Sequence, residues 1–380
     1  MKYIHIVQFH LISGGGVGSV ITDLCQEMAK TSNEVYVYSL QQRRGINYED
    51  EISWGKHFGI HVELMQHTGE SKFKAILNLR QRIKELIQVD ECCLFVHLKW
   101  GVLAGMLASW GLPRAKMVEV YHSGYINYKL QAFISRPFIS HYISVSKDAK
   151  DQLEKWFGIK SSKITVVYNG VALEEIRKNA TKMPNSELFR FVSVGRLSFE
   201  KGFKTPIEAF GLLRKLNRLK ECSYTMVGDG NQRPECESLA RGFVKFTGVV
   251  PRNAVFPIIA SSDVMILPSL WEGHSILLLE VLAVGRAMIL SDIPSFREVM
   301  GFEPLKDGEI FRVEPFGAIF QAGNSESCEN ALLAVYENKE NVKEMSEYAS
   351  KFANQFSIQK QAQMYFTKVS QVKIHKRDLT

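Results

Sequence analysis

The sequence predicts an α/β protein built from two doubly wound domains. Its 380 residues are enough for two domains of ordinary size. Short apolar, strand-like runs alternate with segments of helical spacing, which is typical of parallel sheets with helices on both faces. The pattern restarts at residues 189–194, after a polar, proline-containing segment at residues 178–186. We therefore expect one domain over residues 1–183 and a second over residues 184–356.

The composition excludes several protein classes. Apolar residues make up 46% of the chain and charged residues 23%, as in soluble globular proteins. No apolar run reaches the roughly 18 residues of a transmembrane helix, and the first apolar segment lacks the long hydrophobic region of a signal peptide. The six cysteines form no CxxC pair, and neither they nor the ten histidines show zinc-site spacing. Scattered thiols of this kind suggest a reducing cytoplasm.

The formal charge of +7 is unevenly distributed along the chain. Residues 1–185 hold 23 Lys and Arg against 17 Asp and Glu, a net charge of +6, and the remaining residues carry +1. A basic first half suits an anionic partner such as a lipid phosphate or a bilayer surface. An excess of this size is also ordinary for a soluble domain, and that interpretation stays open.

A glycine-rich loop follows the first predicted strand, at residues 3–9. A helix at residues 19–30 and a strand at residues 34–40 come next. The loop lacks the GxGxxG spacing of a dinucleotide site, no acidic residue closes the second strand, and no P-loop motif occurs. A tight turn needs one or two glycines. Four glycines within residues 14–18 therefore indicate that the backbone approaches a ligand closely.

Residues 72–88 predict an amphipathic helix. Its apolar side chains recur at about 100° per residue, and they are Phe73, Ile76, Leu77, Ile83 and Ile87. Arg80 falls inside this stripe. The favoured interpretation is a helix that packs on the sheet while Arg80 extends its guanidinium to solvent. The alternative is a helix that lies on a membrane surface.

His122 is a candidate site residue in the first half. Strands are predicted at residues 92–97 and 117–121, and His122 directly follows the second of them. Ligands of parallel sheets bind at the carboxyl ends of the strands. A lone histidine is more often structural, so both interpretations remain. Further strand-like segments lie at residues 141–147 and 164–171.

The second half begins with a strand at residues 189–194 and a turn that reads GRLSFEKG. The turn occupies residues 195–202 and opens a helix at residues 205–216. It carries Arg196 and Lys201. Two cations at such a turn suit a diphosphate, although a pair of surface charges is often merely solvated.

Residues 263–292 predict strand, loop, helix and strand, which is one parallel crossover unit. The helix occupies residues 276–284, and Gly285 is well suited to end it. Glu272 precedes the helix and Glu280 lies about two turns inside it, among apolar residues. An ionised carboxylate there is costly unless it is paired. Ligand hydroxyls would serve as partners, and so would a buried Arg or Lys.

Backbone N–H groups between the two glutamates form a candidate anion site. They lie at a predicted helix N-terminus, where unpaired donors and the helix dipole favour negative charge. The residues concerned are Gly273, His274, Ser275 and Ile276.

The turn GRLSFEKG and the two glutamates, in this order, resemble the signature of glycosyltransferase family 4. Seven residues separate Glu272 from Glu280, with Leu-Pro-Ser before them and a glycine after. Weaker matches extend the resemblance over nearly the whole chain, at residues 169–170 (NG), 228–230 (GDG) and 245–249 (KFTGV). The chain departs from the family pattern in four places, at His274, at Ser275, at Arg286-Ala287 and in the length of residues 301–316.

The resemblance implies a GT-B fold, with two Rossmann-like domains that face each other across a cleft. Residues 1–183 would bind the acceptor and residues 184–356 the nucleotide sugar. A last helix within residues 357–380 would cross back to the first domain. The implied reaction is transfer of a sugar to an acceptor hydroxyl, with retention of the anomeric configuration.

The resemblance also implies residue roles. Arg196 and Lys201 would stabilise charge on the leaving diphosphate, Glu272 would position the transferred sugar, and His122 would face that sugar from the first domain. Glu280 would hold the ribose of the donor. The remaining implied donor-binding residues are Gly15, Gly16, Gly228, Gly248, Gly273, His274, Ser275 and Ile276.

The resemblance suggests where such an enzyme works. We expect a saccharide acceptor, lipid-linked and used in polysaccharide or lipopolysaccharide assembly, and no nucleic acid. The location is then cytoplasmic, with docking on the anionic inner face of the cytoplasmic membrane. No DxD motif occurs, so we expect metal-independent transfer without a cofactor.

Two alternatives share the predicted fold. A GT-B nucleotide-sugar epimerase would convert the donor without an acceptor. A non-catalytic subunit would stabilise a partner glycosyltransferase. The intact set of Arg196, Lys201, Glu272 and Glu280 argues against the non-catalytic subunit.

Overall fold

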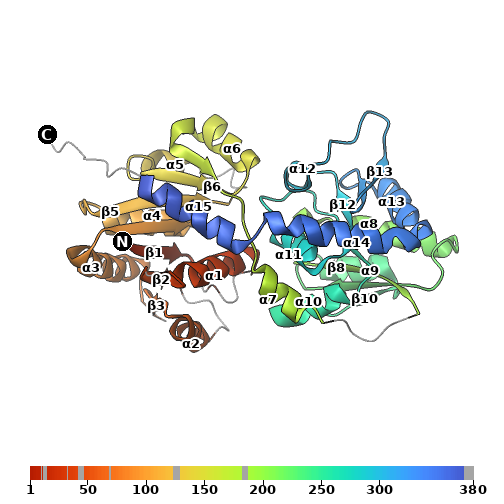
Figure 1. Ribbon diagram of the computed structural model, residues 1–380, viewed down its shortest axis with the longest axis horizontal. Coiled ribbons are helices and arrows are strands. Elements are labelled where there is room, and N and C mark those ends of the chain that lie inside the picture. Colours follow the sequence, from red (N-terminus) through yellow and green to blue (C-terminus); the bar gives the residue numbers. More distant parts are fainter. Residues whose placement is uncertain are drawn as a thin grey trace. The chain divides into compact units, whose positions relative to one another are not determined.

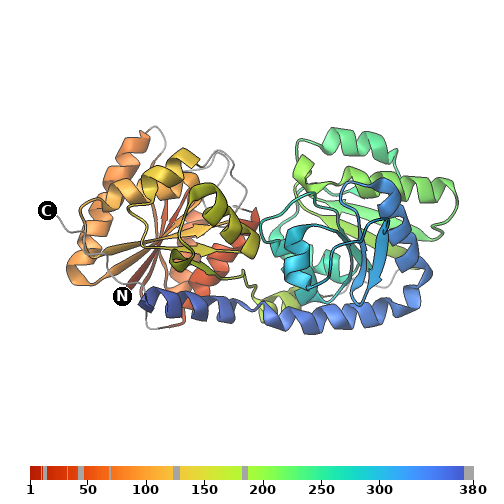
Figure 2. The same ribbon diagram turned by 90° about the horizontal axis from the view of Figure 1, so that it is seen from above.

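The computed structural model describes residues 1–9, 11, 15–31, 33–41, 47–67, 70–122, 129–181 and 187–371. The chain forms two compact units (Figure 1). The first comprises Met1–Gly170 and Ile358–Thr380, and the second comprises Val171–Ser357. Within the described residues each unit holds one seven-stranded sheet with helices on both faces (Figure 2). The prediction of two doubly wound α/β domains is confirmed.

The first sheet has the strand order β3-β2-β1-β4-β5-β6-β7, and all neighbouring strands pair in parallel. The strands are β1 (Lys2–Val7), β2 (Val35–Ser39), β3 (His61–Leu64), β4 (Cys92–His97), β5 (Ala115–Tyr121), β6 (His141–Ser144) and β7 (Ile164–Val166). The central strands β1 and β4 are buried along their whole length, because helices cover both faces of a parallel sheet. All carboxyl ends therefore lie at one edge.

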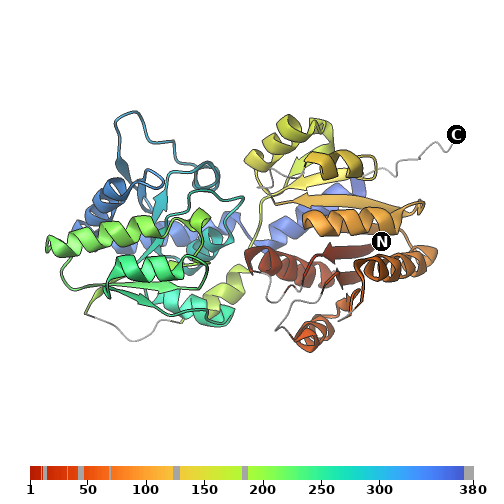
Figure 3. The same cartoon turned by 180° about the vertical axis from the view of Figure 1, so that it is seen from behind.

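The helices of the first unit divide between the two faces of this sheet. They are α1 (Gly15–Ala29), α2 (Tyr48–Phe58), α3 (Lys72–Val89), α4 (Leu98–Ser109), α5 (Lys129–Ser135), α6 (Lys147–Phe157) and α15 (Ile358–Gln371). One apolar cluster joins α3, α4, α5 and α6 to one face (Figure 3). On the other face α15 packs beside α1, and the rings of Tyr365 and Phe366 contact those of Phe95 and Tyr3. The last helix thus belongs to the first unit.

Helix α3 packs on the sheet, as the favoured interpretation expected. It buries Ala75, Ile76, Leu79 and Ile83, and Arg80 donates to the carbonyl oxygens of Ala108 and Trp110 at 2.9 and 2.7 Å. Phe73 and Leu77 are 68% and 49% exposed, so the buried stripe is narrower than predicted. Across the described residues, the structure contains no helix both long and apolar enough to span a bilayer.

The second sheet has the order β10-β9-β8-β11-β12-β14-β13, in which only β13 runs antiparallel among the described strands. Its strands are β8 (Phe189–Val194), β9 (Cys222–Val227), β10 (Val244–Phe246), β11 (Val264–Leu267), β12 (Ala287–Ser291), β13 (Phe311–Glu314) and β14 (Gly317–Phe320). Its helices are α7 (Leu173–Asn179), α8 (Lys204–Lys215), α9 (Arg233–Ala240), α10 (Arg252–Ala260), α11 (Ile276–Val284), α12 (Pro294–Met300), α13 (Ser325–Glu337) and α14 (Val342–Phe352). The β13–β14 hairpin includes residues 311–314 of the segment 301–316.

The boundary between the two compact units lies between Gly170 and Val171, which is earlier in the sequence than the predicted boundary between residues 183 and 184. Val171 and the side chains of α7 are part of the apolar core of the second unit, and α7 contacts α10 and α11. Arg177 of α7 also donates to the carbonyl oxygen of Ser350 at 3.1 Å. The polar segment at residues 178–186 therefore begins in the last turn of a helix of the second unit, and its residues 182–186 lie outside the described part.

Close backbone packing joins the turns that follow β8 and β9. Gly228 has a φ of +130°, and a Cβ atom added there would lie 1.9 Å from the carbonyl oxygen of Gly195. Gly228 N–H donates to the Gly248 carbonyl oxygen, and Leu197 N–H donates to the Asp229 carbonyl oxygen, both at 2.9 Å. Glycine is required here both by the backbone angle and by the space.

We predict that Gly228→Ala destabilises the second unit by about 3 kcal/mol or more, because both the backbone angle and the neighbouring carbonyl oppose a Cβ atom. The matched control is Gly242→Ala, with a φ of +84° and open space around the added atom, which we expect to cost about 1 kcal/mol. Urea denaturation of both variants measures the difference. Equal losses would show that the packing at Gly195 is unimportant.

Candidate active site

Two loops at the carboxyl edge of the second sheet are locked together. One is the turn at residues 195–202 after β8, and the other is the loop at residues 268–275 after the adjacent strand β11. Leu270 N–H donates to the Glu200 carbonyl oxygen at 2.8 Å. A Cβ atom at Gly202, where φ is +64°, would lie 2.2 Å from the carbonyl oxygen of Pro268. The sheet order thus brings the predicted turn beside the predicted glutamate loop.

Lys201 and Glu272 form an ion pair across these loops. Lys201 Nζ lies 2.5 Å from Glu272 Oε1, and Ser269 Oγ donates to the same oxygen at 2.8 Å. The Lys201 and Glu272 side chains are 26% and 14% exposed. Ser291 Oγ, at the end of β12, donates to the Ser269 carbonyl oxygen at 2.6 Å. The cation is therefore held in place by a partly buried, hydrogen-bonded carboxylate.

Arg196 lies exposed on the same turn. The neighbouring Glu200 is influenced by both cations. Burial raises the pKa of Glu200, but the Ser198 hydroxyl at 2.5 Å and the charges of Lys201 and Arg196 bring that pKa below its ordinary value overall. The turn therefore pairs two cations with a carboxylate that stays ionised at neutral pH.

Helix α11 begins and ends as predicted. Ser275 is its N-cap and accepts from Leu278 N–H through Oγ at 3.4 Å. Gly285, with a φ of +73°, is its C-cap. His274 is buried before the first turn, and this burial lowers its pKa to about 4. The imidazole of His274 is therefore neutral. The positive potential at the N-terminus of α11 comes from the helix itself and not from this side chain.

Glu280 is a buried carboxylate with a cationic partner. Its residue is 9% exposed, and its Oε1 lies 3.2 Å from Nη2 of Arg252 at the start of α10. The Arg252 side chain is 40% exposed, so the partner is not the buried cation that the structural alternative expected. Arg252 therefore neutralises a carboxylate that lies within the mainly apolar helix α11.

The predicted residues of the second unit gather at one edge of its sheet. Gly228 and Gly248 join the ends of β9 and β10 there. The residues on or directly beside the two locked loops are Arg196, Lys201, Glu272, Gly273, His274, Ser275 and Ile276. Gly228 packs against Gly195 and bridges to Gly248, and Glu280 lies further along α11.

The predicted residues of the first unit lie at the corresponding edge of the other sheet. Gly15 and Gly16 open α1 and are exposed. A Cβ atom at Gly18 would lie 2.3 Å from the Leu11 carbonyl oxygen, and Leu11 N–H donates to the buried Glu51 carboxylate at 2.8 Å. The rest of the glycine loop, at residues 12–14, and residues 123–128 after His122 lie outside the described part.

His122 is joined to two buried histidines that the sequence did not single out. His5 Nδ1 lies 3.1 Å from His97 Nε2, and His97 Nδ1 lies 3.3 Å from His122 Nε2. His5 and His97 are 0% and 1% exposed. Burial lowers the pKa of His5 to about 3, that of His97 well below its ordinary value, and that of His122 to about 4. All three rings are therefore neutral at physiological pH.

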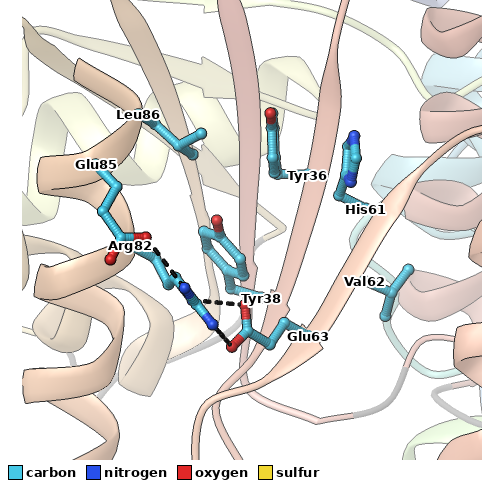
Figure 4. Close-up of a pocket in the computed structure, with 8 residues that line it drawn as sticks. All are labelled: Tyr36, Tyr38, His61, Val62, Glu63, Arg82, Glu85 and Leu86. Carbon is cyan, nitrogen blue, oxygen red and sulfur yellow. Dashed lines mark hydrogen bonds and ion pairs between the residues drawn. The ribbon is translucent and has the colours of Figure 1, made fainter. Parts of the chain in front are cut away.

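A depression on the first unit has different chemistry. It is lined by Tyr36, Tyr38, His61, Val62, Glu63, Arg82, Glu85 and Leu86 (Figure 4). Arg82 pairs there with Glu63 at 2.9 Å and with Glu85 at 3.1 Å. The charge of Arg82 is thus compensated by two carboxylates that line the same depression. None of the predicted site residues lines this depression.

These two sheets, with candidate residues at their carboxyl edges, define the GT-B class of glycosyltransferases. Residues 14–175 match the family model described as Glycosyltransferase Family 4, and residues 174–352 match the model described as Glycosyl transferases group 1. The chain belongs to glycosyltransferase family 4.

Known proteins resemble this chain over different lengths. An uncharacterised glycosyltransferase of Methanocaldococcus jannaschii is 27% identical over 42% of this chain and 44% of its own. A Campylobacter jejuni enzyme, N,N'-diacetylbacillosaminyl-diphospho-undecaprenol alpha-1,3-N-acetylgalactosaminyltransferase, is 25% identical over 51% of this chain and 56% of its own. These alignments therefore span about half of each relative. The Anabaena protein HepE, solved with UDP-glucose, has a TM-score of 0.75 at 17% identity and covers 98% of this chain and 100% of its own, a likeness that shows the fold.

We predict that the chain loses stability as the pH falls below about 6.5. Each histidine with a lowered pKa in the folded state binds a proton more readily after unfolding. The free energy of unfolding then falls by up to about 1.4 kcal/mol per pH unit for each such group. For His274 the loss of stability is expected between pH 6.5 and about pH 4.

Urea denaturation between pH 7.5 and pH 5 tests this prediction. His274→Gln should give a shallower loss of stability with falling pH than the unchanged chain. His57→Gln, which changes an exposed histidine on α2, is the matched control and should keep the original slope. An unchanged slope in His274→Gln would contradict the prediction.

Proposed function

We propose that this protein is a retaining glycosyltransferase that moves a sugar from a nucleotide-sugar donor to a hydroxyl of a saccharide acceptor. The observation that carries the proposal is the Lys201–Glu272 ion pair at 2.5 Å, set between the Arg196 turn and the start of α11. Cations and helix N–H groups at one sheet edge suit a nucleoside diphosphate. The family to which the chain belongs supports the same activity.

In this proposal the main catalytic effect is electrostatic. Lys201 and Arg196 stabilise the charge that develops on the diphosphate as the bond to the sugar breaks. The backbone N–H groups from Gly273 to Ile276 bind the phosphate or the sugar. Glu272 holds Lys201 before the donor arrives and contacts the transferred sugar. The reaction then needs no metal ion to neutralise the leaving group.

Glu280 is proposed to hold the ribose. Arg252 pairs with its Oε1, and ribose hydroxyls of the bound donor are proposed to donate to the same carboxylate. In this arrangement the cation offsets part of the cost of burying the carboxylate. His122 of the first unit is proposed to face the transferred sugar and to donate to it. Gly15 and Gly16, at the start of α1, are proposed to approach the same ligand.

Two of the similar proteins support a proposal for the donor and acceptor classes. The name of the Campylobacter protein specifies an acceptor on diphospho-undecaprenol, and HepE was solved with UDP-glucose. We therefore propose a nucleoside-diphosphate sugar as donor and a lipid-linked saccharide as acceptor, in cell-surface polysaccharide or lipopolysaccharide assembly on the cytoplasmic side. An epimerase would use the same donor edge without an acceptor.

Purified protein tests this function directly. A panel of UDP- and GDP-sugars is first screened for a rise in the melting temperature, because a ligand that binds the folded state stabilises it. The stabilising donor is then incubated with saccharides on undecaprenyl diphosphate in EDTA. We expect a longer saccharide with a retained anomeric configuration. Epimerised donor in the absence of acceptor would support the epimerase, and an absolute need for Mg²⁺ or Mn²⁺ would overturn the site assignment.

We predict that Glu280 and Lys201 variants fail differently. Glu280→Gln removes a charged acceptor that binds the ribose throughout the reaction, so the KM for the donor should rise about tenfold to a hundredfold. Lys201→Ala removes a cation whose effect grows as the bond breaks, so it should mainly lower kcat. Glu272→Gln should also lower kcat more than it raises KM. Steady-state kinetics on folded variants decide between these patterns.

Arg233→Gln is a matched control. Arg233 pairs with Asp229 and Glu237 and has no assigned role, so its loss should leave kcat within about twofold of the unchanged enzyme. Wild-type KM in Glu280→Gln would instead make the Arg252–Glu280 pair purely structural.

The acceptor proposal includes docking on an anionic bilayer, and α5 offers the surface for it. Leu130 and Phe133 are 73% and 76% exposed, and Ile134 is 48% exposed. Arg136 follows this helix directly and is exposed. Apolar side chains beside a cation, on the half of the chain with the excess positive charge, suit a surface of anionic lipids.

We predict that the protein sediments with vesicles that contain phosphatidylglycerol and not with phosphatidylcholine vesicles, and that high salt weakens this binding. Leu130→Ser combined with Phe133→Ser should abolish it. Val249→Ser, at a 79% exposed position of the second unit, should not change it. Negligible sedimentation with both kinds of vesicle would remove membrane docking from the proposal.

A further inference from the structure

Three histidines form a hydrogen-bonded chain through the first sheet. His5 belongs to β1, His97 ends β4 and His122 follows β5. These strands are neighbours in the order β1, β4, β5. The pairing of β1 with β4 and of β4 with β5 therefore carries the chain of rings from the centre of the sheet to its carboxyl edge.

Each contact in this chain needs one N–H group and one nitrogen lone pair. The two contacts are His5 Nδ1 to His97 Nε2 at 3.1 Å and His97 Nδ1 to His122 Nε2 at 3.3 Å. A neutral imidazole carries one N–H group and one lone pair. Once one ring has its proton assigned, the other two follow. Only two arrangements satisfy both contacts, with all three protons on Nδ1 or all three on Nε2.

The buried end of the chain selects between these arrangements. His5 Nε2 has no hydrogen-bond partner within the described part of the structure, and the residue is fully buried. Protons on Nε2 would leave a buried N–H donor unsatisfied at His5. Protons on Nδ1 would leave only an unused lone pair there. Orphaned donors are the rarer and costlier case. The hydrogen-bonded chain of histidines therefore favours a proton on Nδ1 in all three rings.

We propose that His5 and His97 are positioning residues that hold His122 in the Nδ1–H tautomer. Its Nε2 is occupied as the acceptor from His97, so its one N–H group, on Nδ1, is available as a donor. This rests on the proposed function, in which that donor binds a hydroxyl oxygen of the transferred sugar. A fixed tautomer removes the need to reorganise the ring when the sugar binds.

The backbone beside His97 fits this positioning role. Leu98 has a φ of +59°, a left-handed conformation that is unfavourable for a residue other than glycine. Helix α4 starts there and packs closely on the strands, since a Cβ atom at Gly101 would lie 2.9 Å from the Ile6 carbonyl oxygen. The sharp turn after His97 is thus maintained by packing at the place where the ring must stay aligned with its two partners.

Nuclear magnetic resonance of the ligand-free protein tests the tautomers of the three hydrogen-bonded histidines. Histidine is labelled with ¹⁵N in its ring, and two-bond and three-bond couplings from ring carbon-bound protons distinguish Nδ1–H from Nε2–H. Single His→Gln variants assign the signals. We expect His5, His97 and His122 to be neutral at pH 7 with the proton on Nδ1. An Nε2–H tautomer at any of the three would overturn the proposal.

Variants at His97 provide a matched set. The Asn side chain places its amide close to the position of Nδ1, so His97→Asn keeps a donor for His122. The Gln side chain reaches toward the position of Nε2, so His97→Gln does not keep it, and His97→Phe removes it. We expect His122 to remain Nδ1–H in His97→Asn and to shift to Nε2–H, the form favoured by an unconstrained ring, in His97→Gln and His97→Phe.

Activity gives a second readout once a donor is known. His97→Phe should lower kcat/KM about fivefold to tenfold, the worth of one hydrogen bond, and His97→Asn should restore most of the loss. Unchanged activity in His97→Phe would overturn the positioning role. The tautomer measurement uses no sugar, so a protein without transferase activity would refute the proposed function while the tautomers still decide whether the chain positions His122.

Discussion

The pairing of Lys201 with Glu272 is the interaction on which the candidate site of the second unit depends. It joins the loop after β8 to the loop after β11, and both loops must hold their shape for the cation to face one fixed position. Each partner alone would be a partly buried charge, and removing one partner costs more than the pair contributes. Ser269 and the backbone contact at Gly202 support the same junction.

The parallel sheets explain why such junctions arise at all. In a parallel sheet every strand needs a crossover connection, so every carboxyl end delivers its loop to the same edge. Close packing of these loops needs residues without side chains. The residues that allow this packing are Gly195, Gly228 and Gly230. An added Cβ atom at Gly228 would meet the carbonyl oxygen of Gly195, and one at Gly230 would meet the carbonyl oxygen of Leu197. The glycines position the charged residues by bringing their backbones together.

The local sequence was sufficient to predict the central strands and the helix of the crossover unit. Strands β4 and β8 and helix α11 lie where their apolar runs and the capping glycine predicted them. The edge strand β3, with the sequence HVEL, was not recognised, because one exposed and two half-buried positions leave it almost without an apolar signal. The unit division was misplaced because Pro184 and its polar neighbours resemble a linker, whereas α7 is assigned to the second unit by packing with α10 and α11.

The candidate residues were predictable where one motif contains them. Arg196 and Lys201 share a turn, and Glu272 and Glu280 share a crossover unit, so their sequence spacing carries the signal. The ion pairs they form with each other and with Arg252 depend on strand order, which spacing alone does not provide. His5 and His97 were missed for the same reason. Each lies in a predicted strand, but only the pairing of β1 with β4 and β5 places their rings in contact with His122.

The Lys201–Glu272 pair of the second unit and the three linked histidines of the first unit show two different ways of burying polar groups. In the second unit charges are partly buried and compensated, as with Lys201 and Glu272, and such a site suits an anionic ligand that competes for the cation. In the first unit burial keeps the histidines neutral, and the lowered pKa values follow from that burial. A neutral ring with one fixed N–H group suits a hydroxyl oxygen, which has no charge to offer in return. This difference in electrostatics supports the proposal that the cations of the second unit bind the diphosphate and that His122 of the first unit donates to a hydroxyl oxygen.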